Sequence, residues 1–232
     1  MKYGCLKWCG LLIALLFFTG TTAAYAVMGD IGISAKGSTL GYGGEVTLGL
    51  TSAFNARVGV NTFNYNGDFD VENINYSAGL KLKTTPLLLD WHPFGKRSFR
   101  LTSGIVFNSN VITGTAKATN DGNISIGDKN YSFGSTNEIT SLSGKIDFKK
   151  SAPYIGFGWG NVVGKSKSVS FSFDIGAILQ GTPNVSLSAK GPISEDPAFK
   201  TELEKELANV KETSDKIKYY PVISLGLGVK LW

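Results

Sequence analysis

The residues of this chain that could do chemistry are charged side chains standing alone in segments rich in glycine and serine. Six of them occupy alternate positions of strand-like segments, on the side that also carries glycine: Asp30, Glu45, Arg57, Asp90, Arg100 and Asp174. Successive side chains of a strand point to opposite faces, so this pattern predicts that all six face one interior. Glu45 would pair there with Arg57, and Asp90 with Arg100, which avoids unpaired buried charge. The alternative is that these charges line a narrow path for ions or solutes.

The chain has a single histidine, His92, which stands beside Pro93 at the end of a strand-like segment. A histidine-dependent nucleophile needs a nearby serine or carboxylate. The strand-end position instead favours a turn residue or one at a membrane interface. No His/Cys metal spacing is present, and no phosphate-binding glycine loop precedes a helix. We therefore expect no enzyme, no cofactor and no metal.

The first residues have the pattern of a secretory signal peptide. Two lysines precede the apolar run Leu11–Phe18, and Ala24-Tyr25-Ala26 forms a small-x-small cleavage site. We expect residues 1–26 to be removed, which leaves 27–232 as one domain. Both cysteines precede the cut, so the mature chain has no disulfide.

Net charge and hydropathy argue against two further classes of protein: those that bind nucleic acid and those that cross a membrane with helices. Removal of Lys2 and Lys7 with the signal peptide lowers the net charge from +5 to +3, which is too small to suggest nucleic acid as a partner. No stretch after the signal peptide approaches the ~18 apolar residues of a membrane helix.

The last fourteen residues predict a strand that crosses a bilayer. From Tyr219 to Trp232 one alternate face is apolar throughout, and the other carries mainly small and polar residues. That pattern fits lipid on one side and a narrow polar lumen on the other. Similar alternation occurs in seven earlier segments: 27–36, 40–50, 55–61, 76–91, 99–107, 146–159 and 169–180. The sequence therefore predicts an all-β fold, an eight-stranded antiparallel transmembrane β-barrel.

The connections between these segments predict the orientation of the barrel. Short links at 51–54, 95–98 and 161–168 would be periplasmic turns, and the long segments 108–144 and 181–218 would be extracellular loops. Aromatic residues near the short links would form a girdle at the membrane interface. These residues are Trp91, Phe94, Phe99, Trp159 and Trp232.

Two segments change the phase of their alternation. In 76–91 the apolar residues are even-numbered up to Leu82 and odd-numbered afterwards, and 146–159 changes in the same way; Pro86 and Pro153 lie at the changes. One extra residue reverses the facing of a strand, and proline in a sheet belongs at an edge or bulge. We therefore predict a β-bulge near each proline, with Lys81 and Lys83 pointing inward.

Local structure is also predicted within the two long loops. Gly127-Asp128 separates two short β-prone stretches, which indicates a small hairpin. Asp196 would cap a helix from Pro197 to Lys211 with one apolar stripe. An isolated helix of this length is marginal in water, so we expect it to pack on loops or on a partner. A disordered linker is the alternative.

Two motifs resemble those of small outer-membrane barrels of the OmpW and OmpA-like type. The segment Ala152-Pro153-Tyr154-Ile155-Gly156-Phe157-Gly158 resembles their Pro-Tyr-x-Gly-x-Gly strand, and Ser224–Leu231 is similar to their C-terminal strand. One departure is that Leu231, rather than an aromatic residue, holds the last position in phase with the apolar face, and Trp232 follows it. The resemblance implies a location in the cell outer membrane.

The partners expected of such a barrel are outer-membrane lipid, lipopolysaccharide and the barrel-assembly machinery. Two roles fit the sequence. The first is structural or that of a conduit for small solutes; the OmpW likeness implies a hydrophobic solute that leaves sideways through the wall. The alternative is a surface-interaction or adhesin-type protein that binds an extracellular partner through the loops 108–144 and 181–218.

Overall fold

Eight antiparallel strands close into a barrel. The computed structural model describes residues 29–71, 74–94, 98–118, 121–134, 138–164, 169–214 and 217–231. The expected signal peptide and Trp232 lie outside the described residues, so cleavage after Ala26 stays a prediction. The barrel strands are β1 (Ile31–Ser38), β2 (Gly41–Gly49), β3 (Phe54–Val71), β4 (Ile74–Trp91), β5 (Phe99–Asn108), β10 (Ser151–Trp159), β11 (Ser170–Leu179) and β13 (Tyr219–Lys230). They pair in the order β1-β2-β3-β4-β5-β10-β11-β13, and β13 returns to β1.

The outer surface of the barrel is apolar, as the alternation predicts. Outward residues such as Val58, Leu87 and Leu227 are exposed, whereas their strand neighbours on the inner side are buried or glycine. Aromatic rings gather at the end of the barrel that carries the short turns, where Trp159 packs against Phe99 at 5.6 Å and Phe173 at 6.2 Å between ring centroids. We call this the turn end and the opposite one the outer end. The predicted girdle is therefore present among the described aromatic residues.

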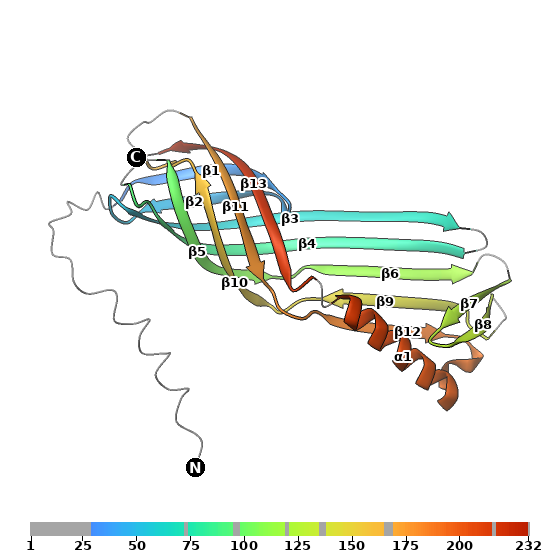
Figure 1. The fold of residues 1–232 in the computed structure, drawn as a ribbon. Coiled ribbons are helices and arrows are strands. Elements are labelled where there is room, and N and C mark those ends of the chain that lie inside the picture. Colours follow the sequence, from blue (N-terminus) through green and yellow to red (C-terminus); the bar gives the residue numbers. More distant parts are fainter. Residues whose placement is uncertain are drawn as a thin grey trace, which may run out of the picture.

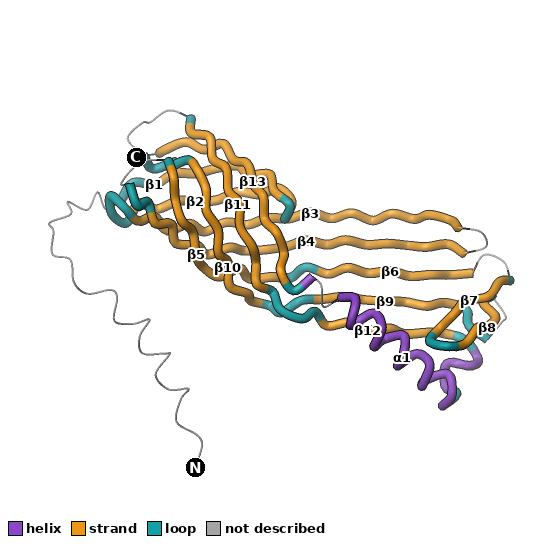
Figure 2. The backbone as a smooth tube through the Cα atoms, viewed as in Figure 1, coloured by secondary structure: helices purple, strands orange, loops and turns teal. Residues whose placement is uncertain are grey.

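A five-stranded sheet continues from one side of the barrel beyond its outer end (Figures 1 and 2). The outer halves of the 18-residue strands β3 and β4 form its first two strands. The other three are β6 (Val111–Ala118), β9 (Ser141–Asp147) and β12 (Asn184–Lys190), paired in the order β4-β6-β9-β12. The segments expected as long loops thus contain much of a regular extramembrane sheet.

A hairpin and a helix cover part of this sheet. The hairpin is β7 (Gly122–Ile126) and β8 (Lys129–Phe133), joined at Gly127 with φ +60, as Gly127-Asp128 predicts. A 3-10 turn, η1 (Pro192–Glu195), leads to α1 (Pro197–Ser214), which packs along β12. Together these elements enclose a second hydrophobic core outside the barrel: Ala116, Ile126, Tyr131, Phe133, Ile139 and Phe199.

The helix begins where the sequence predicts. The carboxylate of Asp196 accepts hydrogen bonds from the backbone N–H groups of Ala198 at 2.7 Å and Phe199 at 3.1 Å, which satisfies donors that the first helical turn leaves free. The helix runs three residues past the expected end at Lys211. Among the residues that the structure describes, no helix is long and apolar enough to cross a membrane.

The predicted bulge near Pro86 is wrong. Leu87 pairs with Ile105 and Leu80 pairs with Ile112, and the two pairs are seven residues apart on both strands (87 − 80 and 112 − 105). The pairing with β3 lapses at Thr85 and Pro86 but resumes in the same register. No residue is inserted, so the facing of β4 never reverses.

The side chains of β4 show the consequence. Leu82, Thr84 and Leu88 are all buried on the inner side, whereas Lys81 and Lys83 are exposed on the outer side, opposite to the prediction. The apolar pattern changes because the strand leaves the membrane. Beyond that level the outer side meets water, and the inner side becomes the apolar one.

The register is also continuous through Pro153 on the β5 and β6 side, where Pro153 pairs with Ile105 and Ile146 with Ile112. One extra residue does occur on the other side. From the pair Asp147–Asn184 to the pair Tyr154–Ile178, the chain of β9 and β10 advances by seven residues, whereas the chain of β12 and β11 covers the same distance with six. The inner side still remains the inner side, because Phe148 and Tyr154 are both buried.

Candidate functional site

The most concentrated chemistry of the molecule lies midway along the barrel interior, around Arg57. Its Nη1 lies 3.1 Å from Oε1 of Glu45, and its Nε lies 2.6 Å from Oδ2 of Asp90. A hydrogen bond runs from Nη2 to the other carboxylate oxygen of Asp90 at 2.8 Å. Asp174 approaches Nη1 at 3.6 Å. One guanidinium on β3 thus joins carboxylates from β2, β4 and β11.

Arg100 extends the network toward the turn end. Its Nη2 donates to Oδ1 of Asp174 at 2.6 Å, and its Nη1 donates to the carbonyl of Gly160. The expected partner Asp90 is farther away, 3.8 Å from Nε. The predicted pairing of Glu45 with Arg57 is present, whereas Arg100 pairs mainly with Asp174.

Lys36 completes the network, although the sequence analysis missed it. Its Nζ lies 3.2 Å from Glu45 and 3.0 Å from Asp174. The expected first segment, 27–36, ended at Lys36, whereas β1 extends to Ser38. The alternation Asp30, Gly32, Ser34, Lys36 would have placed Lys36 inward. We name this group the lumen network: Lys36, Arg57, Arg100, Glu45, Asp90 and Asp174.

The lumen network carries no net charge, because three cations face three carboxylates. Every side chain in it is at most 10% exposed. Hydroxyls supply further donors to the carboxylates: Thr102 to Asp90 at 2.7 Å and Ser224 to Asp174 at 3.2 Å. Buried charges are tolerated when they are paired and hydrogen-bonded in this way. The network therefore closes the lumen at this level.

The other residues considered for a site lie elsewhere. Asp30 is at the turn end, 2.8 Å from Nζ of Lys230, and lies apart from the lumen network. His92 is buried inside the same end rather than in the outer girdle, with Nε2 at 3.1 Å from Nδ2 of Asn55 and Nδ1 at 3.1 Å from the carbonyl of Phe99. Its ring nitrogens thus meet an amide and a backbone carbonyl in the wall of the barrel.

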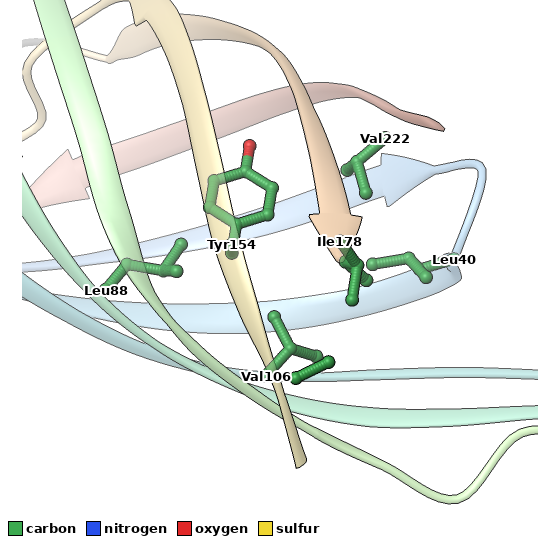
Figure 3. Packing of buried hydrophobic residues seen from close by; sticks show 7 residues of the cluster. Leu40, Leu88, Val106, Tyr154, Ile178 and Val222 are labelled. Atoms are coloured by element: carbon green, nitrogen blue, oxygen red, sulfur yellow. The ribbon is translucent and has the colours of Figure 1, made fainter. Parts of the chain in front are cut away.

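An apolar layer lies above the lumen network, toward the outer end. Figure 3 shows Leu40, Leu88, Val106, Tyr154, Ile178 and Val222 converging from the barrel strands and the β1–β2 turn. The alternation of segment 40–50 predicts an outward Leu40, but its side chain is only 4% exposed and belongs to this layer. The layer and the lumen network leave a cavity of about 40 Å³ between them. That volume holds roughly a few water molecules.

The motif that suggested the resemblance has a packing role in this layer. The hydroxyl of Tyr154 lies over two glycines, and a Cβ atom on Gly156 would come within 2.7 Å of it. A side chain on Gly176 of the next strand would collide with the same hydroxyl. The glycines thus make room for an inward tyrosine in a lumen that side chains fill.

A belt of amide and hydroxyl side chains follows at the lip of the barrel. Nδ2 of Asn61 donates to Thr84 at 3.2 Å, and Nδ2 of Asn108 donates to Gln180 at 3.4 Å. Oδ1 of Asn110 accepts from the backbone of Lys83 at 2.9 Å. This polar belt separates the apolar layer from the extramembrane sheet.

Comparison with solved structures identifies the class of fold. The crystal structure of Acinetobacter baumannii CarO2 superposes with a TM-score of 0.58 at 22% identity, covering 88% of this chain and 99% of that one. Acinetobacter baumannii CarO gives a TM-score of 0.54 at 22% identity, with 88% and 98% covered. At this identity the likeness shows the fold alone. The chain is a closed eight-stranded antiparallel barrel of the outer-membrane type.

No protein-family model matches the sequence, and no curated protein matches it. The finer resemblance to OmpW therefore stays a prediction.

Proposed function

We propose that this protein is a non-catalytic binding protein of the outer membrane, which acts through its extramembrane part rather than as a general pore. The observation that carries the proposal is the contrast between a lumen closed by the lumen network and a second hydrophobic core built outside the barrel. Segments that only connect strands have no need of such a core. Ordered segments on a rigid scaffold commonly carry binding.

The other role expected from the sequence, a conduit for small solutes, requires the lumen network to open. The cavity of about 40 Å³ is lined by the network on one side and by the apolar layer on the other. An eight-stranded lumen is narrow enough for side chains to fill. A closed barrel surrounded by lipid and lipopolysaccharide, placed there by the assembly machinery, is the state that we propose.

Single-protein conductance in a planar bilayer tests this proposal. We expect the unmodified protein to show no steady open level. Arg57→Ala and Arg100→Ala should each raise the conductance, because each leaves carboxylates uncompensated and admits water. Lys145→Ala is the matched control, since that lysine lies on the exposed outer side of β9. A large, steady, unselective conductance from the unmodified protein would overturn the proposal.

A further inference from the structure

The lipid-facing wall of the barrel is hollowed on one side. Two open hollows, of about 420 Å³ and about 380 Å³, lie next to each other on the outward surface of the barrel strands around β1 and β2. They meet at Ile33 and Gly44, which line both. We name them the wall hollows. The outward side chains that surround them are aliphatic: Ile33, Val46, Val58, Val60, Val169 and Leu227.

Small residues make this space. Gly44 lies opposite Ala35 on β1 and opposite Val60 on β3, so the outward row across these strands has no side chain at one position and only a methyl group at the next. A Cβ atom added to Gly44 would come no closer than 3.6 Å to the carbonyl oxygen of Ser34. The backbone could therefore carry a side chain at Gly44, and the glycine leaves room on the lipid side.

Two lysines stand at the outer end of the wall hollows. Thr85 lines the first hollow, and the next outward residues of β4 toward the outer end are Lys83 and Lys81. At roughly 3.4 Å per residue they lie about 7 and about 14 Å beyond Thr85 along the strand. Thr62 of β3 pairs with Lys83, and Asn64 pairs with Lys81. We name these four residues the rim: Thr62, Asn64, Lys81 and Lys83.

The rim begins at the level where the apolar outward side chains of β3 and β4 end. Val60 is the last of them on β3 and is 60% exposed, and Leu87 is the last on β4 and is 51% exposed. The outward residues beyond are polar, as expected where the strands leave the hydrocarbon. The rim therefore lies at the height of lipid headgroups, and the wall hollows lie directly beneath it.

The charge of the rim is not neutralised by the protein. In the described part of the chain neither Lys81 nor Lys83 forms an ion pair, whereas Lys145 on the same side of the sheet lies 3.4 Å from Asp147. Asp68 of β3 is four residues beyond Asn64, about 14 Å farther from the membrane. The rim thus offers two ammonium groups to an anion.

The place of this surface in the membrane indicates what covers it. Hydrocarbon surrounds the outward side of a membrane barrel, so acyl chains fill the wall hollows. A phosphate at headgroup level accepts hydrogen bonds from both lysines of the rim. The hydroxyl of Thr62 and the amide of Asn64 offer hydrogen bonds to a sugar. A phosphorylated glycolipid with more than one acyl chain meets all three conditions.

We propose that the wall hollows and the rim together form a binding site for lipopolysaccharide. Two acyl chains lie in the hollows, and a phosphate of the sugar headgroup lies between Lys81 and Lys83. The inference goes beyond the proposed function, which concerns the extramembrane part. Any lipid can cover the apolar wall, and the rim makes this side of the barrel selective for a phosphorylated one.

A second copy of the chain is less suited to the same surface. Two barrels in one membrane are related by a two-fold axis along the membrane normal, which keeps each residue at its own height. An interface through the wall hollows would therefore bring Lys81 and Lys83 toward the same lysines of the other copy. Like charges repel at that height, and Asp68 stays farther out in both copies.

Native mass spectrometry of the full barrel, released from detergent, measures which lipid is retained. The probes are rough-type lipopolysaccharide, the same lipid with its phosphates removed, and phosphatidylglycerol. We expect the phosphorylated lipopolysaccharide to bind at least about tenfold more tightly than the dephosphorylated form. Equal retention of the two forms overturns the proposal. Phosphatidylglycerol bound as tightly as lipopolysaccharide would show a general site for anionic lipid and would also overturn it.

Variants of the rim test the phosphate contact. Lys81→Ala with Lys83→Ala should weaken binding of phosphorylated lipopolysaccharide by about tenfold or more and leave the dephosphorylated form unchanged. Lys117→Ala is the matched control, because that lysine is exposed on the same side of the sheet near its far end. It should change binding by less than about twofold. Equal effects of the two variants overturn the proposal.

A variant of the wall tests the acyl contact. Gly44→Leu fills the space where the hollows meet and should weaken binding of both forms by about tenfold. Ala177→Leu adds the same side chain on the outward side of β11, beyond both hollows, and should change little. A folded Gly44→Leu barrel that binds normally overturns the proposal. Gel migration of the unheated barrel checks folding, and if Gly44→Leu fails to fold, the exposed lysines of the rim decide alone.

Two further measurements separate the remaining outcomes. Val60→Cys should give no disulfide-linked dimer in membranes, and efficient cross-linking would show that a second copy covers the hollows and would overturn the proposal. Conductance is recorded on the same preparation. An open pore would reject the proposed function while lipid retention still decides the site. A closed barrel that retains no lipopolysaccharide would reject only the site.

Discussion

The lumen of the barrel and the apolar side of the extramembrane sheet lie on the same side of β3 and β4, yet their chemistry is opposite. On β4 this side carries Asp90 in the lumen network and Leu80 in the extramembrane sheet. The interior of the barrel is filled by neutralised charge, whereas the sheet outside leaves apolar surface open. The comparison teaches that backbone register fixes which way a side chain faces, and that height along the barrel axis fixes the environment it meets.

The largest expected effect is a loss of barrel stability from a change in the lumen network, away from the extramembrane sheet. Arg57→Ala removes the guanidinium that joins Glu45, Asp90 and Asp174, and leaves three carboxylates facing only Lys36 and Arg100. Removing one partner of a buried ion pair costs about 3–5 kcal/mol. Urea unfolding of the barrel in lipid vesicles measures the loss.

Lys145→Ala serves as the control for this measurement. Its ion pair with Asp147 is half exposed, so the change should cost under about 1 kcal/mol. Comparable losses in the two variants would show that the lumen network does not hold the barrel together.

The next effect is a loss of stability in the hairpin–helix unit of β7, β8 and α1 that leaves the barrel folded. Phe199 is 1% exposed and packs edge to face on Tyr131 with ring centroids 5.0 Å apart. Phe199→Ala should cost the hairpin–helix unit about 3 kcal/mol. Protease added to intact cells should then cut α1 rapidly, while the barrel keeps its migration on an unheated gel.

Lys200→Ala is the matched control on the next residue of the helix, which is exposed. Rapid cutting of α1 in the unmodified protein would contradict the packed helix. Cleavage only after the outer membrane is opened would reverse the orientation of the barrel.

The lumen network was largely predictable from the sequence, and the sheet was not. Glu45, Arg57 and Asp174 stand in strands whose alternation is regular, so their facing could be read directly. The outer strands lacked that signal because their exposed side carries Ser, Thr and Asn, which also suit loops. In β12, Val185, Leu187 and Ala189 do alternate with polar residues, and that pattern could have revealed a strand.

The error over Lys81 and Lys83 has a physical cause. Apolar side chains were assumed to face lipid along the whole of β4, and that assumption required a bulge at Pro86. In the sequence, the height at which the strand leaves the membrane shows only as the change of phase, and a bulge would produce the same pattern.

A smaller effect tests whether Asp196 stabilises the first turn of α1. Asp196→Ala removes the acceptor for two backbone N–H groups at the start of α1. Loss of such a cap costs about 1 kcal/mol. Amide hydrogen exchange should accelerate in the first turn of α1 and remain unchanged in β13, whereas uniform acceleration would contradict a local role.

The smallest effect depends on pH and concerns the contact between hairpin and helix. The backbone N–H of Asp128 donates to Glu202 at 2.9 Å, and Lys205 bridges both carboxylates. That backbone hydrogen bond, followed by the one from Lys205, lowers the pKa of Glu202 below its usual 4.5. The hydrogen bond from Lys205 likewise lowers the pKa of Asp128.

Because the folded-state pKa values are lowered, this contact stabilises fully above pH 4.5 and is lost as pH falls through them. Near-ultraviolet circular dichroism of the Tyr131 environment should therefore change only on acidification below that value. Glu202→Gln should flatten the change. A transition at neutral pH would contradict this assignment.

The unbroken register of β3 and β4 also has a mechanical consequence. Each strand runs without insertion from the turn end of the barrel to the far end of the sheet. A pull on the sheet away from the membrane acts along these strands and loads the hydrogen bonds between them in shear. The sheet is therefore a continuous extension of the barrel wall, and force applied to it is carried by the same two strands into the barrel.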